Sequence, residues 1–399
     1  GMDDGPRSGG VGLWARDGQA FFGTVEALPV EREEQLVDDL TPSFAGIIDR
    51  ATWAGRANFL MADPDDLTLV WHTGEFVADV TAKAGVLRQP DEPVTVASLI
   101  LGDGGDPDSG YEARFARTWG EEGVELTLLR RGEAVEVGTA DMPADQDAFE
   151  IEFARNNGAL VMRVDGETVL VHNDRERLDV RRVGMKLVGS LLRPDDTRIE
   201  TANVRVYTFG QAPTDWITEC GTWEVASRWS CSPGWTWFAG WDFKDAWCTN
   251  KEIFRGDQRL DMFVGAKMVD LPNNQKQEVL RDIRLGLCTT PGDINSGYRF
   301  VLGGKGNTWT AILRDGKVLA ETAWGMPQGG LHNDWALVSA VKRGNVLTVS
   351  WEGHEILRAE DPEPLSQGHA AIGTFDNGIM VPKMTIFGQL VAREPVEAN

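Results

Sequence analysis

The hexapeptides DPDSGY at 106–111 and DINSGY at 293–298 share the triplet Ser-Gly-Tyr and lie 187 residues apart. The same offset relates Phe76-Val77 to Phe263-Val264. Other matches keep their order while the offset drifts by a few residues at a time: Leu129–Gly132 with Leu313–Gly316, Asp165-Gly166 with Glu352-Gly353, and Phe209–Gln211 with Phe387–Gln389. A repeat of this length predicts a tandem duplication of one domain of about 190 residues.

Each repeat contains short apolar runs joined by tight turns. Ala159–Val164 is followed by Asp165-Gly166, and Val346–Trp351 is followed by Glu352-Gly353, in each case before a second short run. An acidic residue followed by Gly between two such runs predicts a β-hairpin, because Gly tolerates the positive φ of a tight turn.

The other local patterns also favour strands. Arg281–Leu287 places Ile283, Leu285 and Leu287 on one face, which is typical of a half-buried strand. The best candidate for a helix is Glu31–Leu40, with a loop as the alternative. Many short strands with Gly-rich turns predict an all-β protein of two sandwiches, with domains at 12–211 and 212–392.

Composition separates the two halves of the 399-residue chain. Residues 1–210 hold 39 acidic and 21 basic side chains, a balance of −18, whereas residues 211–399 contribute only −5. Tryptophan has the opposite distribution, with 4 in the first part and 11 in the second. The net charge of −23 argues against a nucleic-acid partner, and no apolar run reaches the roughly 20 residues of a membrane span.

The chain ends and cysteines leave the compartment open. Gly1 before Met2 is typical of the remnant of a cleaved tag, and the polar residues after it lack the basic and apolar regions of a signal peptide. A protein made without a signal and one trimmed of it are the two alternatives. The four cysteines fit either two disulfides in an exported protein or buried free thiols in a cytosolic one: Cys220, Cys231, Cys248 and Cys288.

The second half carries a succession of polar and aromatic motifs. They are Asn250-Lys251, Phe254–Asp257, Asp282-Ile283, Ser296–Tyr298, Arg314–Gly316, His332 with Trp335, Asp361–Leu365 and Asp376–Gly378. This succession resembles the concanavalin A-like lectin/glucanase superfamily, in particular its laminin-G-like and 3-keto-disaccharide-hydrolase-like bacterial members. The resemblance implies two tandem jelly-roll sandwiches and an oligo- or polysaccharide partner on a concave sheet face. The E-x-D-x-x-E carboxylates of retaining glucanases of this fold are absent.

The second repeat holds polar residues that the first does not match. At the offset of 187 Asp282 and Arg284 fall opposite Thr95 and Ala97, and at an offset of 186 His332 falls opposite Gln146. Sugars are bound by aromatic faces together with carboxylates, amides and arginines. We therefore expect the second domain to bind the ligand, with these side chains as contacts: Trp241, Trp247, Asn250, Lys251, Arg284 and Asp376.

Two groups are candidates for acid–base chemistry. General acid–base catalysis needs a pair such as a carboxylate and a histidine, which Asp282 and His332 would supply if their strands are neighbours. Glycoside hydrolysis is then the reaction class to expect. The alternatives are a non-catalytic lectin-like binder and a laminin-G-like protein-interaction module.

An acidic, Gly-rich loop gives one candidate metal site. Asp103, Asp106 and Asp108 present carboxylates within six residues, and hard oxygen ligands suit a structural Ca²⁺ ion. The alternative is a solvated turn in which Asp side chains accept hydrogen bonds from the local backbone.

Overall fold

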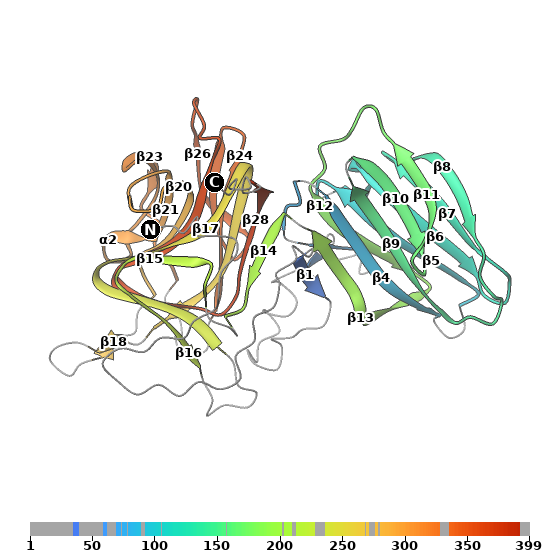
Figure 1. Cartoon of the computed structure of the whole chain (residues 1–399), viewed down its shortest axis with the longest axis horizontal. Coiled ribbons are helices and arrows are strands. Elements are labelled where there is room, and N and C mark those ends of the chain that lie inside the picture. Colours follow the sequence, from blue (N-terminus) through green and yellow to red (C-terminus); the bar gives the residue numbers. More distant parts are fainter. Residues whose placement is uncertain are drawn as a thin grey trace, which may run out of the picture.

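The structure is a computed structural model, and Figure 1 shows two β-rich lobes side by side. It describes residues 35–39, 59–61, 69–72, 74–77, 79–88, 92–104, 106–156, 158–201, 203–209, 213–227, 236–267, 269–270, 276–277, 280–327 and 335–391. Every strand pair is antiparallel. The fold is all-β, as the sequence predicts.

The first lobe is a sandwich of two sheets. One sheet has the order β1 (Gln35–Asp39), β13 (Ser190–Thr201), β4 (Val80–Arg88), β9 (Ala148–Asn156), β10 (Ala159–Val164) and β11 (Glu167–Asn173). The other has the order β2 (Phe59–Met61), β3 (Leu69–His72), β12 (Arg182–Val188), β5 (Val94–Gly102), β6 (Tyr111–Thr118), β7 (Val124–Arg130) and β8 (Glu133–Ala140). Residues such as Phe153 and Phe115, one from each sheet, pack in the core between them.

Most described strands of the second lobe form one connected 13-stranded sheet folded into a sandwich, and two long strands contribute to both of its layers. These are β17 (Thr236–Ala266) and β27 (Gln367–Val381). The front sheet adds β15 (Trp216–Cys220), β20 (Ile283–Thr289), β21 (Tyr298–Gly303), β22 (Trp309–Arg314) and β23 (Lys317–Thr322). The back sheet adds β14 (Val204–Tyr207), β28 (Met384–Leu390), β24 (Ala336–Arg343), β25 (Val346–Trp351) and β26 (His354–Glu360).

Smaller elements complete the second lobe. β16 (Thr222–Ser227) pairs with the start of β17, and β18 (Val269–Asp270) pairs with β19 (Lys276–Gln277). The short turn α2 (Gly304–Asn307) connects β21 and β22, and the first lobe has one 3-10 turn, Pro107–Ser109. In the front sheet Ile283, Leu285 and Leu287 all face the core, which confirms the alternation predicted for β20.

The predicted hairpins are confirmed. β10 pairs with β11 through Asp165-Gly166, and β25 pairs with β26 through Glu352-Gly353. All four of these turn residues have positive φ, between 49° and 81°, which is the geometry of a tight two-residue turn. The helix expected at Glu31–Leu40 is wrong over residues 35–39, which form strand β1, because pairing with β13 decides the conformation there.

The same hydrogen-bonded group occurs in both lobes. In the first, the Tyr111 hydroxyl donates to Asp174 Oδ2 at 2.6 Å and accepts from the Leu178 amide at 2.9 Å. In the second, Tyr298 donates to Asp361 Oδ2 at 2.6 Å and accepts from the Leu365 amide at 2.8 Å. Arg130 and Arg314 donate to the respective carboxylates. Each Asp thereby fixes the loop that follows it.

The lobes meet at an interface that combines apolar and charged groups. Phe387 of β28 packs edge-on against Phe76, with ring centroids 5.5 Å apart, within the core cluster of the first lobe. Beside them Glu75, only 8% exposed, accepts a hydrogen bond of 2.6 Å from Arg343 of the second lobe. Arg259 of the second lobe and Arg182 of the first lie 3.8 Å and 3.6 Å from the same carboxylate.

The remaining expectations concern thiols and membranes. Cys220, Cys248 and Cys288 are free thiols, and Cys231 lies outside the described residues. Burial raises the pKa of the Cys288 thiol to about 11. Among the residues that the structure describes, no helix is long and apolar enough to cross a membrane.

Candidate functional site

Three charged side chains meet at one end of the front sheet, and we call them the Arg284 cluster: Asp245, Asp282 and Arg284. The alternation of β20 turns Arg284 away from the core, where its Nε donates to Asp282 Oδ1 at 2.5 Å and its Nη1 donates to Asp245 Oδ1. Asp282 precedes the strand with φ +46°, and its amide donates to Gly303 O at 3.0 Å. One guanidinium therefore bridges two carboxylates.

Burial sets the electrostatics of this cluster. Asp282 is buried, and burial raises the pKa of its carboxyl; the charge of Asp245 adds to this effect, while Arg284 opposes it. On the neighbouring strand β21, burial and the like charge of Arg284 lower the pKa of Arg299. The Arg299 Nε is buried and makes no hydrogen bond, although its Nη2 donates to Asn295.

Exposed aromatic rings border the Arg284 cluster. Phe375 of β27 pairs with Asp245 in the sheet and is 40% exposed, and the Arg284 guanidinium lies 5.2 Å from the centre of its ring. Phe243 is 45% exposed and lies in the irregular register between Asp242 and Asp245. Its ring contacts that of Trp241 edge-on, with centroids 6.1 Å apart. We call Trp241, Phe243 and Phe375 the aromatic edge.

The turn α2 lies on the other side of the cluster. Lys305 and Gly306 within it have left-handed φ of 52° and 72°. A Cβ at Gly304 would be 3.4 Å from Asp282 Oδ2 and 2.8 Å from the Trp309 ring, so the backbone passes closely between them. The Lys305 ammonium covers the Trp309 ring at 4.1 Å, which removes that face from any ligand.

Four of the residues predicted from the sequence lie together at this end of the sheet: Trp241, Asp282, Arg284 and Asp376. Asp376 accepts a hydrogen bond of 2.9 Å from Arg281, the residue before Asp282. Trp241 pairs with Gly378, two positions along β27 from Asp376. His332, predicted as the partner of Asp282, lies outside the described residues.

Three other predicted contacts lie elsewhere. Trp247 is 2% exposed and packs over Gly373 and Gly286, so stacking of a sugar on it is not supported. Asn250 is fully buried and donates to the Tyr207 hydroxyl at 2.8 Å, a structural contact. Asn250 and Lys251 follow Asp245 along β17 by five and six positions, roughly 17–20 Å at the rise of a strand.

The predicted calcium loop forms a local turn. Asp106 Oδ1 accepts a hydrogen bond of 2.9 Å from the Asp108 amide, and the Asp103 amide donates to Ser109 Oγ at 3.0 Å. Among the described residues, no group of three or more His, Cys, Asp or Glu side chains is arranged to hold a metal ion. The calcium site expected at these three residues is therefore not supported, because the loop uses a carboxylate to cap its own backbone.

Sequence reasoning missed Asp245, Phe243, Phe375 and Arg299. The signal for Asp245 was available, since it stands beside Trp241 and Trp247 in the Trp-rich stretch. Phe375 directly precedes the Asp376–Gly378 motif. Only the pairing of β17 with β27 brings these two segments together, from opposite ends of the domain.

The fold and the site define an antiparallel β-sandwich protein with a charged and aromatic patch at one sheet end. A carbohydrate-binding module of Bacillus subtilis is 14% identical and covers 44% of this chain and 93% of its own, with a TM-score of 0.31. A B. subtilis protein of unknown function with a galectin-like fold is 12% identical, covering 47% and 96% (TM-score 0.34). A Bacillus licheniformis β-glucanase is 8% identical, covering 36% and 72% (TM-score 0.25).

No protein-family model matches the chain, and no curated protein matches it. The assignment of the fold therefore rests on the sheet order and strand pairing of the chain itself.

Proposed function

We propose that the second sandwich binds carbohydrate at the end of its front sheet, through the aromatic edge and the Arg284 cluster. The observation that carries the proposal is the exposure of Phe243 and Phe375, 45% and 40%, directly beside an ion-paired Arg and two carboxylates. Covering an exposed aromatic ring with the apolar face of a sugar removes apolar surface from water, which favours binding. Fixed carboxylates and a guanidinium then accept from and donate to the hydroxyl groups.

The cluster favours binding over hydrolysis. A glycosidase needs two carboxyl groups roughly 5–10 Å apart with the scissile bond between them. Here the Arg284 guanidinium occupies the space between Asp245 and Asp282 and bonds to both. The raised pKa of Asp282 would suit a general acid, but its Oδ1 already accepts from Arg284. We therefore propose a non-catalytic, lectin-like role.

A panel of neutral oligosaccharides, followed by calorimetry on each hit, tests this proposal. We expect Phe375→Ala and Trp241→Ala each to weaken binding by about tenfold, since losing one stacked ring costs about 1–2 kcal/mol. Val137→Ala, at an exposed apolar residue of the first lobe, is the matched control and should leave the affinity unchanged. Absence of binding to every sugar, or binding that Phe375→Ala leaves unaltered, would overturn the proposal.

We also propose that the two lobes are copies of one duplicated domain. The support is the Tyr–Asp pair that both lobes contain. Tyr298 follows Tyr111 by 187 residues, Asp361 follows Asp174 by the same number, and the two pairs are bonded alike. The strand orders β5-β6-β7-β8 and β20-β21-β22-β23 also correspond. β14, which precedes the predicted limit at 211, pairs with β28 of the second lobe, while its Val204 packs in the core cluster of the first lobe.

A further inference from the structure

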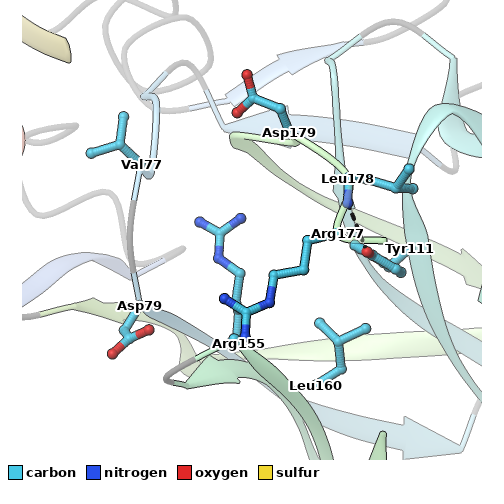
Figure 2. A pocket seen from close by; sticks show the side chains of 9 residues that line it. Val77, Asp79, Tyr111, Arg155, Leu160, Arg177, Leu178 and Asp179 are labelled. Carbon is cyan, nitrogen blue, oxygen red and sulfur yellow. Dashed lines mark hydrogen bonds between the residues drawn. The ribbon is translucent and has the colours of Figure 1, made fainter. Parts of the chain in front are cut away.

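A cavity of about 230 Å³ lies in the first lobe, far along the chain from the Arg284 cluster (Figure 2). It is formed where β9 ends and β10 begins, together with the segments that precede β4 and β12. Four charged side chains line it, Asp79, Arg155, Arg177 and Asp179, beside aliphatic ones such as Leu160. Its volume is below the roughly 300–1,000 Å³ of pockets for drug-sized ligands, so it suits a molecule as small as one sugar unit.

Arg155 is a fixed positive charge in this cavity. Its Nη1 donates to Val180 O at 2.7 Å and its Nη2 donates to Phe76 O at 2.6 Å. These bonds hold the guanidinium against two loop segments. Burial lowers the pKa of Arg155, while the nearby Asp79 and Asp179 raise it, and the group stays charged at neutral pH because an arginine pKa is far above 7.

Arg177 differs because its guanidinium has neither a hydrogen-bond nor an ion-pair partner within the described chain. Figure 2 shows both the Arg155 and the Arg177 side chains in the cavity. Gly158, with φ +82°, provides the space, since a Cβ there would overlap the Arg177 guanidinium. The partner-free Arg177 is notable in a half of the chain whose charge balance is −18.

The carboxylates of the cavity restrict what this pair of arginines can hold. Asp179 lines the cavity, and its carboxylate is paired with Arg181, at 2.9 Å and 3.1 Å. With Asp79 it would repel a doubly charged phosphate, whereas both carboxylates can accept hydrogen bonds from hydroxyl groups. A guanidinium binds a carboxylate through two parallel N–H donors.

Comparison of the lobes separates Arg177 from Arg155. Through the duplication proposed above, the bonded pairs Tyr111–Leu178 and Tyr298–Leu365 place Arg177 opposite Pro364. The same offset places Arg155 opposite Lys342, which is buried and donates to Gly256 O at 2.9 Å. The second lobe is therefore built without a charge at the position of Arg177, whereas it keeps a cation bonded to the backbone at the position of Arg155.

From these contacts we infer that the cavity of the first lobe binds a small hydroxylated monocarboxylate, a sugar acid, with Arg177 and Arg155 holding its carboxylate. The aliphatic wall at Leu160 accommodates its C–H face, and Asp79 and Asp179 accept from its hydroxyl groups. This site is separate from the proposed neutral-sugar surface of the second lobe.

Calorimetry on the full chain with D-glucuronate, D-galacturonate, D-glucose and inorganic phosphate tests the inference. We expect at least one of the two acids to bind, with neither glucose nor phosphate binding comparably. Arg177→Ala should weaken acid binding by about 10–100-fold, because a hydrogen-bonded charge contact contributes about 1.5–3 kcal/mol. Arg177→Lys keeps the charge but loses the two parallel N–H donors, so its affinity for the acid should lie between those of wild type and Arg177→Ala.

The control is Arg175→Ala, which removes an exposed arginine from the same loop. It should leave acid binding unchanged, and so should Phe375→Ala, which separates this site from the proposed sugar surface. Circular dichroism verifies that each variant is folded. Failure of both acids to bind at millimolar concentration, equal binding by Arg177→Ala, or tighter binding of phosphate than of either acid would overturn the inference.

Discussion

The substitution Glu75→Gln removes the central negative charge from the interface between the lobes. Nitrogen atoms of Arg343, Arg182 and Arg259 lie 2.6–3.8 Å from the Glu75 carboxylate. At an effective dielectric constant of about 20, each such pair is worth about 4 kcal/mol before desolvation is subtracted. Removing one partner of a buried ion pair costs about 3–5 kcal/mol, because the largely buried guanidinium groups of Arg182 and Arg259 then lose a counter-charge.

This loss should be visible in a thermal melt at neutral pH. For a lobe of this size about 1 kcal/mol corresponds to a shift of about 2–4 °C, so we expect Glu75→Gln to lower Tm by about 6–20 °C. If the interface couples the unfolding of the two lobes in the wild type, calorimetry of Glu75→Gln should resolve the lobes into separate transitions. Asp147→Asn is the control: its side chain is 71% exposed and 3.5 Å from Arg88, and such a pair contributes about 0–1 kcal/mol.

The pH dependence gives a second measure of the same contact. Burial raises the pKa of Glu75, but the charges of Arg259, Arg343 and Arg182 outweigh it and hold the pKa below its ordinary value. A carboxyl with a depressed pKa in the folded state stabilises the protein above its unfolded pKa, about 4.3, and this stability is lost as the pH falls toward the folded pKa. The stability gap between wild type and Glu75→Gln should therefore narrow below about pH 4. A Tm within about 2 °C of wild type at pH 7, or a gap independent of pH, would refute the reasoning.

Two further substitutions test the packing of the second lobe. Gly373→Ala places a Cβ in overlap with an indole ring and should lower the free energy of unfolding by about 1–3 kcal/mol in urea titration, whereas Gly138→Ala, with its nearest neighbour at 3.5 Å, should change it little; equal effects would contradict this. Tyr298→Phe removes the hydroxyl that bonds a buried carboxylate and a backbone amide, and we expect a loss of about 1–3 kcal/mol by the same titration. A loss below about 0.5 kcal/mol would show that the hydroxyl is dispensable.

Local signals in the sequence predicted the strands well. The hairpins at Asp165-Gly166 and Glu352-Gly353 form because the Gly of each turn accepts positive φ at no steric cost, a property of the residue itself. The alternation of Ile283, Leu285 and Leu287 likewise matches their complete burial. Such features depend on neighbours in the chain and can be predicted without tertiary contacts.

The positions of the site residues depend on strand pairing between segments that are distant in the sequence, and local sequence patterns do not predict this pairing. The constant offset set Arg284 opposite Ala97, yet Ala97 packs in the core and Arg284 faces outward, so these positions are not equivalent. One inserted residue reverses the face of every side chain in a strand. The irregular register between Asp242 and Asp245 has a similar effect on the aromatic edge, where Phe243 leaves the regular alternation.

The length of β17 has a consequence for how the second lobe forms. This one strand pairs with β15, β16, β24, β27 and β28, and so belongs to both layers. Its pairing of Ala246 with Thr374 joins segments separated by most of the domain. Pairing at such sequence separation is slow, on the order of milliseconds to seconds in all-β domains, because the loop must close before any contact forms. During synthesis the edge of β17 that pairs with β27 stays unpaired until β27 emerges, and an unpaired strand edge is prone to pairing with other chains.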